Sequence, residues 1–186
     1  MILKKLTAIV CILLLPMYTY NAASHNSNAI YCNGKIIAYA IKKEVNPHAS
    51  MPSTKNYPIS QYNSTDHQSL IDQFFQHSEL FNFQSPDAPT IENALVAIDH
   101  TSQSICGFLE YKTTATSDIY IEFLATHPDF RRKGIAQNLL QTVEAQHQTA
   151  RAITLIVAAQ NTQAIELYKK IGFQIPENLN SEQTLF

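Results

Sequence analysis

The chain has 186 residues, of which 45% are hydrophobic and 15% are charged, and its formal net charge is −2. This length predicts one domain that is large enough to bury a hydrophobic core. The absence of a basic excess argues against general binding to nucleic acid. Three consecutive cations lie at residues 131–133, and such a local cluster suits one polyphosphate ligand better than a polymer.

The N-terminal region carries the signature of an export signal, namely a cationic start, a ten-residue apolar run and small residues near a cleavage point. The run is shorter than the ~20 residues that a transmembrane helix needs. We therefore predict an export signal over residues 1–23 and a single domain over residues 24–186, located in the periplasm or secreted. The three features are, in order, Lys4–Lys5, Leu6–Leu15 and Ala22–Ala23.

Two alternatives to cleavage and export stay open. Cleavage after Ala22 or Ala23 leaves Tyr20 or Asn21 three residues before the bond, where a small residue is favoured. An uncleaved segment would anchor the protein, and this anchor would be its one contact with a membrane. A true start at Met17 would instead place the protein in the cytoplasm.

Hydrophobic periodicity over the rest of the chain predicts strands and helices in mixed order. Residues 46–65 show no periodicity and are rich in Pro, Ser and Asn. Asp66 is the predicted capping residue of the first helix, and Pro86 and Pro89 break the chain after it. The predicted elements are strands over 35–41, 94–98, 105–111, 119–124 and 152–158, and helices over 66–81, 133–148 and 162–171.

The most informative segment joins the strand that ends near Thr126 to the next helix. Pro128 cannot donate a ladder hydrogen bond, so the strand ends before it. The three cations and Gly134 follow, and a helical pattern begins at once. This order brings free backbone N–H groups, the positive end of a helix dipole and mobile charges together, which predicts a phosphate site. Gly134 lets the backbone approach the ligand without a Cβ, and Ala136 is the next smallest choice.

Two common phosphate loops do not match this segment. The one Gly-Lys pair, Gly34-Lys35, is followed by Ile36 where a P-loop needs Ser or Thr. The four glycines of the chain form no Gly-x-Gly-x-x-Gly fingerprint. Taken alone, the cations at residues 131–133 are also consistent with a solvated basic turn.

A second segment begins after the strand over residues 152–158. Asn161 is a good N-cap for the last helix, and Gly172 is a good residue to end it. Asn161, Ala164, Ile165 and Tyr168 are spaced so that they share one helix face.

The two segments together resemble the coenzyme-binding motifs of the GNAT superfamily of acetyl-coenzyme A-dependent N-acyltransferases. The matching patterns are Arg131-x-x-Gly134-x-Ala136 and Asn161-x-x-Ala164-x-x-Leu167-Tyr168-x-x-x-Gly172-Phe173. Ala136 stands where glycine is commoner in the family. The resemblance covers roughly residues 31–186 and is specific from about 119 to 173. It implies a mixed α/β fold with a central, mostly antiparallel sheet, one splayed parallel strand pair and helices on both faces.

The resemblance also implies a site for acetyl-coenzyme A as co-substrate. The pantetheine arm would bind the backbone of Leu124 and Thr126 like an added strand, and the three cations would neutralise the phosphates. Asn161 would hold the pantetheine or only cap its helix. The implied coenzyme-binding residues are Leu124, Ala125, Thr126, Arg131, Arg132, Lys133, Gly134, Ile135, Ala136 and Asn161.

Two side chains are implied as catalytic. Tyr168 would protonate the departing thiolate, because a phenol still holds its proton at neutral pH; simple packing on the apolar helix face is the alternative. Glu122 would take the proton of the amine, and period-two alternation places it on one side with Tyr120 and Leu124. Glu110 on the adjacent strand is a weaker competitor for this role.

The resulting hypothesis is an N-acetyltransferase that transfers acetyl directly to a primary amine of a small molecule or a protein, as a monomer or a homodimer. The rivals are a catalytically inactive GNAT fold that binds coenzyme A or a partner protein, and an exported interaction domain whose loop binds another anion. The seven histidines show no metal-ligand spacing, so no metal is expected. Cys32 and Cys106 are expected as buried free thiols.

Overall fold

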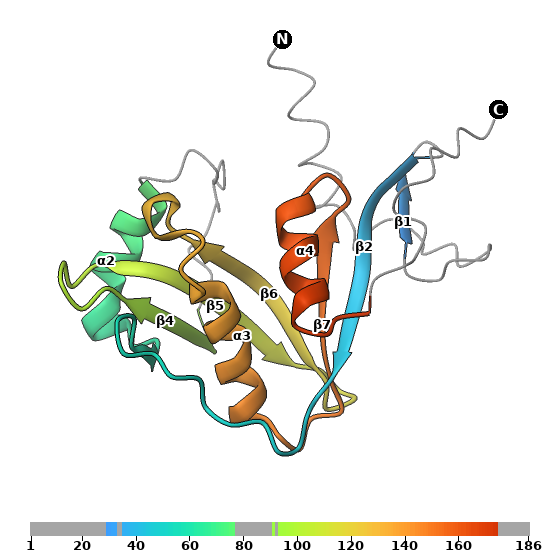
Figure 1. The fold of residues 1–186 in the computed structure, drawn as a ribbon, viewed down its shortest axis with the longest axis horizontal. Helices are drawn as coiled ribbons and strands as arrows, with labels where there is room; N and C mark the ends of the chain where they lie inside the picture. Colours follow the sequence, from blue (N-terminus) through green and yellow to red (C-terminus); the bar gives the residue numbers. More distant parts are fainter. Residues whose placement is uncertain (1–28, 33–34, 77–90, 92, 175–186) are drawn as a thin grey trace, which may run out of the picture. The chain divides into compact units, whose positions relative to one another are not determined.

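The computed structural model describes residues 29–32, 35–76, 91 and 93–174 (Figure 1). They fall into two compact units, one of residues 43–155 and one of residues 1–42 with 156–186. The predicted export signal and the predicted end of the first helix lie outside the described residues. None of the helices within the described ranges is long and apolar enough to cross a membrane.

The unit of residues 43–155 is built on a sheet with the order β3-β4-β5-β6-β7. All neighbours in it are antiparallel except β6 and β7, which are parallel. The predicted fold class, a mostly antiparallel sheet with one parallel pair, is thereby confirmed. The strands are β3 Ile59–Gln61, β4 Ala94–Ile98, β5 Ile105–Thr113, β6 Ile119–Thr126 and β7 Ala152–Ala158, of which β7 continues into the other unit.

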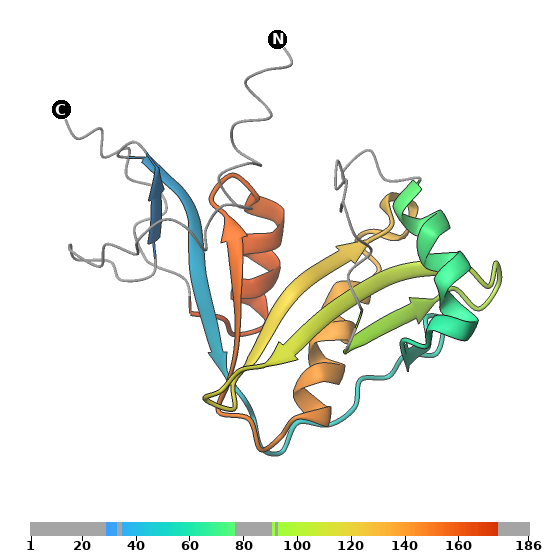
Figure 2. The ribbon, with the colours of Figure 1, turned by 180° about the vertical axis from the view of Figure 1, so that it is seen from behind.

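Two helices cover opposite faces of this sheet, α3 (Ile135–Gln146) in front in Figure 1 and α2 (Ser64–Gln76) in front in Figure 2. Two consecutive residues of β5 show which helix covers which face, because neighbours along a strand point to opposite faces of the sheet. Phe108 belongs to the buried cluster that contains Ile71 and Phe74 of α2. The adjacent Gly107 lies under α3: a Cβ built on it would come within 2.5 Å of the Ile135 side chain. The helix packs closely against β5 because residue 107 has no side chain.

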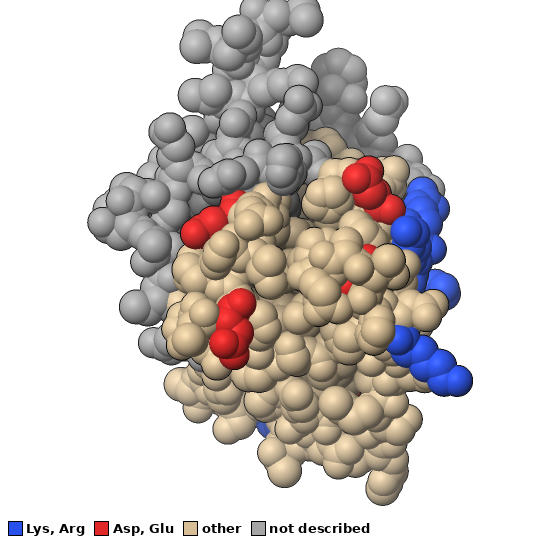
Figure 3. Space-filling view, turned by 90° about the vertical axis from the view of Figure 1, so that its left-hand side faces the viewer, with Lys and Arg blue, Asp and Glu red and all other residues tan. Residues whose placement is uncertain are grey.

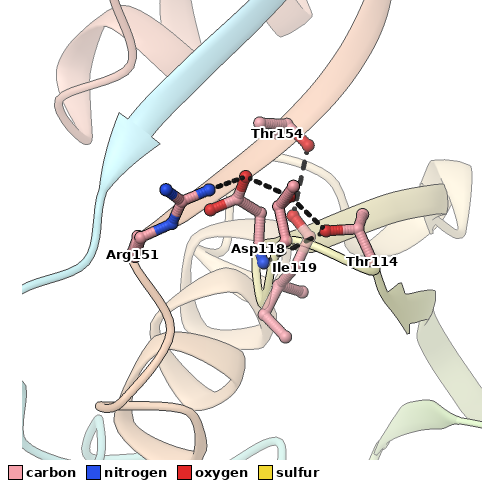
Figure 4. Close-up of polar contacts among 6 residues, drawn as sticks. Thr114, Asp118, Ile119, Arg151 and Thr154 are labelled. Atoms are coloured by element: carbon pink, nitrogen blue, oxygen red, sulfur yellow. Dashed lines mark hydrogen bonds and ion pairs between the residues drawn. The ribbon is translucent and has the colours of Figure 1, made fainter.

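The parallel ladder between β6 and β7 is short. It pairs Ile119 with Ile153 and Tyr120 with Thr154, and within the described residues it goes no further. Polar contacts fix this end of the two strands (Figure 4). Arg151 donates to Asp118 at 3.3 Å, and the Thr154 hydroxyl donates to the Ile119 carbonyl at 3.3 Å. The strands are therefore held together only where they begin.

A buried carboxylate fixes the start of residues 43–49 on the last turns of α3. Glu144 is 4% exposed, and it accepts hydrogen bonds from the Lys43 ammonium and from the Asn46 backbone N–H. The Val45 N–H donates to the Arg151 carbonyl nearby. A buried charge is tolerated when it is paired and hydrogen-bonded in this way.

The unit of residues 1–42 and 156–186 contains β1 (Ala29–Cys32), which pairs antiparallel with β2 (Lys35–Glu44), and α4 (Thr162–Lys170). After α4, the Gln174 N–H donates to the Lys42 carbonyl of β2. Buried side chains in this unit come from β2, from the end of β7 and from the segment of α4: Ala38, Tyr39, Ile41, Val157, Ile165, Tyr168 and Phe173.

The predicted strands and helices are confirmed with shifts of a few residues, and three details differ. The sequence interpretation missed β1 and β3, the latter inside the passage that lacked periodicity. It also assigned the wrong cap to α2. The helix begins at Ser64, and Asn63 caps it by accepting from the Thr65 N–H at 2.9 Å, while Asp66 lies in the first turn.

Candidate active site

The loop between β6 and α3 presents free main-chain donors. Gly134 is the N-cap of α3 with φ +80° and makes no side-chain capping bond. The N–H groups of Ile135, Ala136 and Gln137 precede the first helical bond, which Asn138 donates to the Gly134 carbonyl, and they have no partner within the described ranges. Nothing lies within 4 Å of a Cβ built on Gly134. The space beside Gly134 is therefore open at the N-terminus of α3, where the free N–H groups and the positive end of the helix dipole lie.

Residues 131–133 of this loop carry three positive charges, and Asp129 of the short helical turn precedes them. Arg131, Arg132 and Lys133 are exposed, and none forms an ion pair with a carboxylate of the described residues. The first turn of α3 holds no acidic residue. In the view of Figure 3, Lys and Arg side chains lie along the right-hand edge, and Asp and Glu side chains are scattered over the rest of the surface. The arrangement fits a phosphate group, since the donors, the dipole and the cations act on the same place.

Aromatic rings support the short helical turn before the cations. Phe130 packs edge-on against Tyr57 and His127, with ring centroids 6.1 and 5.7 Å away. The Lys133 ammonium lies 4.6 Å from the Phe130 ring centroid, within range of a cation–π interaction. The His127 N–H donates to the Cys106 carbonyl of β5. These contacts hold the loop to the sheet from which it emerges.

One edge of β6 offers backbone groups next to this loop. In an antiparallel pair, alternate residues of a strand form backbone hydrogen bonds with the neighbouring strand. Because the His127 N–H donates to the Cys106 carbonyl, residues 127 and 125 form these bonds with β5, and residues 126 and 124 do not. Leu124 and Thr126 therefore direct their N–H and C=O groups to the other edge, as predicted. Ala125 does not, because its backbone faces β5 and its side chain is buried in the core. Of Leu124, Ala125 and Thr126, two therefore present their backbone groups at the edge of β6 that faces away from β5.

The predicted orientation of Glu122 is half wrong, because β6 has a bulge there. Glu110 pairs with Phe123 and the next residue, Tyr111, pairs with Ile121, so Glu122 is an extra residue without a partner in β5. Leu124 pairs with Leu109, on the α3 face. Glu122 instead bonds to Lys112 on the opposite face, where Lys112 also lies over the Tyr120 ring. Glu122 thus shares a side with Tyr120, but not with Leu124.

The carboxylates beside the bulge have different environments. Glu122 accepts a hydrogen bond of 2.6 Å from Lys112, which raises the pKa of that ammonium. Glu110 is partly buried and forms no hydrogen bond or ion pair with the described residues. Burial and, after it, the nearby Glu122 charge raise the pKa of Glu110. Glu122 is therefore engaged by an ammonium, whereas Glu110 is partly buried without such a partner among the described residues.

The second motif forms the predicted cap and helix within its own unit. The Asn161 side chain accepts from the Ala164 N–H at 3.2 Å, and Gly172 follows the helix with φ +94°. Tyr168 is 7% exposed, and its ring contacts Phe173 with centroids 5.3 Å apart. Burial raises the pKa of Tyr168 to about 12. Its hydroxyl forms no hydrogen bond with any residue that the structure describes, so the proton remains available for a ligand.

The comparison with protein families is decisive for the assignment of this fold. The model of the acetyltransferase (GNAT) family matches residues 59–173, which include both motifs. The chain belongs to the GNAT family. A curated relative, "UPF0157 protein YqkA" of Bacillus subtilis, is 42% identical over 62 residues, which are 33% of this chain and 18% of that protein.

Solved structures of GNAT proteins share the fold at low identity. A GCN5-related N-acetyltransferase from Sphaerobacter thermophilus is 18% identical with a TM-score of 0.58, over 75% of this chain and 48% of that one. NAA60 of Arabidopsis thaliana, solved with acetyl-CoA, is 20% identical with a TM-score of 0.50, over 62% of this chain and 84% of that one. The chain thus spans about half the length of the first structure and under a fifth of the curated relative.

Some residues that shape this GNAT site were missed at the level of the sequence. Gly107, which lets α3 approach β5, had no local signal, because its importance depends on a helix that begins 28 residues later. The bulge at Glu122 was missed because it follows from strand register rather than from alternation. Within the described part of the chain, no three His, Cys, Asp or Glu side chains are grouped in a way that could hold a metal ion.

Proposed function

We propose that this chain is an N-acetyltransferase that transfers the acetyl group of acetyl-coenzyme A directly to a primary amine. Membership of the GNAT family supports acetyl transfer in general. The observation that carries the proposal is the loop from Arg131 to Ala136, with its open space beside Gly134, its exposed cations and its N–H groups that have no partner among the described residues. Those donors fit the diphosphate of the coenzyme, and the free edge at Leu124 and Thr126 fits its amide-containing pantetheine arm.

Direct transfer is supported by the state of the cysteine beside this loop. An acetyl-enzyme intermediate on a cysteine needs an accessible thiolate. Cys106 is fully buried, its thiol donates to the Ala97 carbonyl, and burial raises its pKa to about 12. Cys106 is a free thiol, as expected, but it is unsuited to carry an acyl group.

Tyr168 is the proposed donor to the leaving sulfur. With a pKa of about 12 it stays protonated at neutral pH, and it holds its proton more tightly than a thiol with an ordinary pKa of ~8.5. We therefore assign it the donation of a hydrogen bond that stabilises the thiolate as the C–S bond breaks, in the manner of an oxyanion donor. Asn161 then acts as the helix cap, as its bond to the Ala164 N–H supports.

The proposal is tested by thioester turnover with acetyl-coenzyme A and a panel of primary amines. We expect intersecting initial-velocity lines, which indicate a ternary complex, and a loss of about 10²-fold in kcat for Tyr168→Phe, with KM for the coenzyme unchanged. Tyr62→Phe removes a hydroxyl that, among the described residues, donates to Gln68; it is the matched control and should keep its rate. Coenzyme binding without turnover of any amine would show an inactive binding domain instead.

Export remains a proposal that rests on the sequence of residues 1–23. Fractionation of cells that express the full chain, followed by N-terminal sequencing, tests it. We expect a mature N-terminus near Ser24 in the periplasm or the medium. Recovery of the uncut chain in the cytoplasm would contradict export, and recovery of the uncut chain in the membrane fraction would favour the anchor.

A further inference from the structure

The His127 imidazole completes the hydrogen bonding of the short helical turn that leads into the cations. Its Nδ1 atom accepts from the Asp129 N–H at 3.3 Å. The N–H groups of Phe130 and Arg131 donate to the carbonyls of His127 and Pro128, and Pro128 has no N–H of its own. The backbone donors of this turn are therefore all accounted for, and the first of them depends on a side chain.

The same ring attaches the turn to its surroundings. It is partly buried, with 22% of the side chain exposed, and its centroid lies 6.3 Å from that of Phe74 of α2 and 5.7 Å from that of Phe130. The His127 N–H donates to the Cys106 carbonyl of β5. Phe130 in turn lies 4.6 Å from the Lys133 ammonium. His127 thus connects α2 and β5 to the turn that carries the cations.

The hydrogen bond from Asp129 requires one particular form of the imidazole. Only an unprotonated Nδ1 can accept, so the neutral ring must carry its proton on Nε2. Protonation would place an N–H at Nδ1 opposite the Asp129 N–H, and two donors cannot bond to each other. The ring would then pair with the Asp129 carboxylate, whose Oδ2 atom lies 3.8 Å from Nδ1. That carboxylate is 84% exposed, so the ion pair would replace little of what the cap contributes.

We propose that His127 is a positioning residue of the coenzyme site, and that its neutral form holds the cations in the arrangement that binds the diphosphate. The inference rests on the proposed function and adds to it a residue that acts through the turn rather than on the reacting atoms. Protonation of the ring releases the Asp129 N–H and loosens the turn, so the affinity for the coenzyme falls in acid. The added positive charge does not reverse this effect, because the Asp129 carboxylate lies beside it.

The elements that pack on the ring bring few competing charges. Asp129 and Lys133 belong to its own loop, β5 contributes the Cys106 thiol, and α2 contributes the apolar ring of Phe74. Burial raises the pKa of Cys106 to about 12, and the Asp99 and Lys133 charges act on that pKa in opposite directions. Among the described residues, Asp129 is the charged group within ion-pair distance of the ring.

The first test is the protonation state of the ring, measured by nitrogen NMR of the imidazole in the full chain across a pH titration. We expect the neutral His127 ring to carry its proton on Nε2, as the bond from Asp129 requires. A neutral ring with its proton on Nδ1 would overturn the proposal, because such a ring cannot cap the turn.

Trypsin measures the order of the loop without any ligand, because it cleaves after the exposed cations at residues 131–133. His127→Phe keeps a ring beside Phe74 and Phe130 but removes the acceptor. We expect its cleavage there to be about fivefold faster, which corresponds to the ~1 kcal/mol that a helix cap contributes. His100→Phe is the matched control, because His100 is exposed and its printed bonds involve only its backbone. It should keep the original cleavage rate at these residues.

Calorimetry with acetyl-coenzyme A then connects the cap to the site. The unsubstituted chain and His127→Phe are compared at one pH above and one pH below the imidazole transition that NMR locates. We expect the variant to bind about fivefold more weakly above the transition and equally below it, where both proteins lack the cap. Titration of the coenzyme phosphates affects both proteins alike and leaves the ratio unchanged. At saturating coenzyme kcat should be the same for both.

Other outcomes overturn the assignment in distinguishable ways. An affinity ratio that is the same at both pH values would reduce His127 to a packing residue. Equal cleavage and equal affinity above the transition would exclude the cap. If the unsubstituted chain binds no acetyl-coenzyme A, the proposed function fails and the role of His127 at a coenzyme site fails with it, while NMR and trypsin still decide whether the ring holds the turn.

Discussion

The absence of a side chain at residue 107 gives the sharpest prediction about stability. A Cβ there would lie 2.5 Å from Ile135 Cγ2, 3.1 Å from Leu139 Cδ1 and 3.4 Å from the Ala97 Cβ. The first gap is about 1 Å short of ordinary carbon contact at ~3.5 Å. We expect Gly107→Ala to push the first turn of α3 away from β5 and to cost about 2 kcal/mol of unfolding free energy, as overpacked cores do.

A double-mutant cycle in urea unfolding measures this clash directly. At this chain length, 2 kcal/mol lowers Tm by about 4–8 °C. Ile135→Ala removes the clashing methyl, and on its own it costs about 2–4 kcal/mol. The double variant should be more stable than the sum of the two changes predicts, by at least about 1 kcal/mol. Additive effects, or a Gly107→Ala protein as stable as the original, would refute the close approach of α3 and β5.

Gly134→Ala is the matched control for the clash. A Cβ at residue 134 has open space, so the expected cost is that of a positive φ, about 1–2 kcal/mol. Ile135→Ala should therefore not rescue it. Gly107→Ala should also weaken acetyl-coenzyme A binding, because the clash displaces the turn that presents the free N–H groups.

Three further changes test other parts of the structure. Glu144→Gln should cost about 3 kcal/mol in urea unfolding, because it leaves the Lys43 ammonium without its partner; a loss under 1 kcal/mol would contradict a buried pair. Burial lowers the pKa of His147 from 6.5, so the unfolded state binds more protons and stability should fall as pH drops below about 6.5 towards the native value. His147→Phe should flatten that slope in Tm measured against pH, and an unchanged slope would assign it to other groups. Arg132 has φ +63°, so Arg132→Gly should raise stability by about 0.5 kcal/mol while it weakens coenzyme binding; no change in affinity would remove Arg132 from the phosphate site.

The sequence predicted the main strands and helices because their signals are local. The apolar runs of β4, β5 and β7, the alternation at the start of β6 and the caps at Asn161 and Gly172 depend on residues within or next to one element. The short strand β3 has only three residues, and it forms because Ile59 and its neighbours pair with β4. A pairing partner more than thirty residues away leaves no periodicity to detect.

In the candidate site, too, the features with a local sequence signal could be predicted and those that depend on strand pairing could not. The loop at Gly134 could be predicted, because a glycine between a strand, a row of cations and a helix is a local pattern. The register around Glu122 could not be predicted, since one extra residue changes which side chains share a face. The contact between Glu122 and Lys112 depends on that register.

Calorimetric titration with acetyl-coenzyme A, beside S-acetylpantetheine as the same thioester without its diphosphate and nucleotide, tests the central claim most directly. We predict one site per chain, an affinity for the whole coenzyme that falls as salt is raised, and binding of S-acetylpantetheine at least tenfold weaker. Equal affinity for the two thioesters, or no binding of either, would contradict a phosphate site at the start of α3.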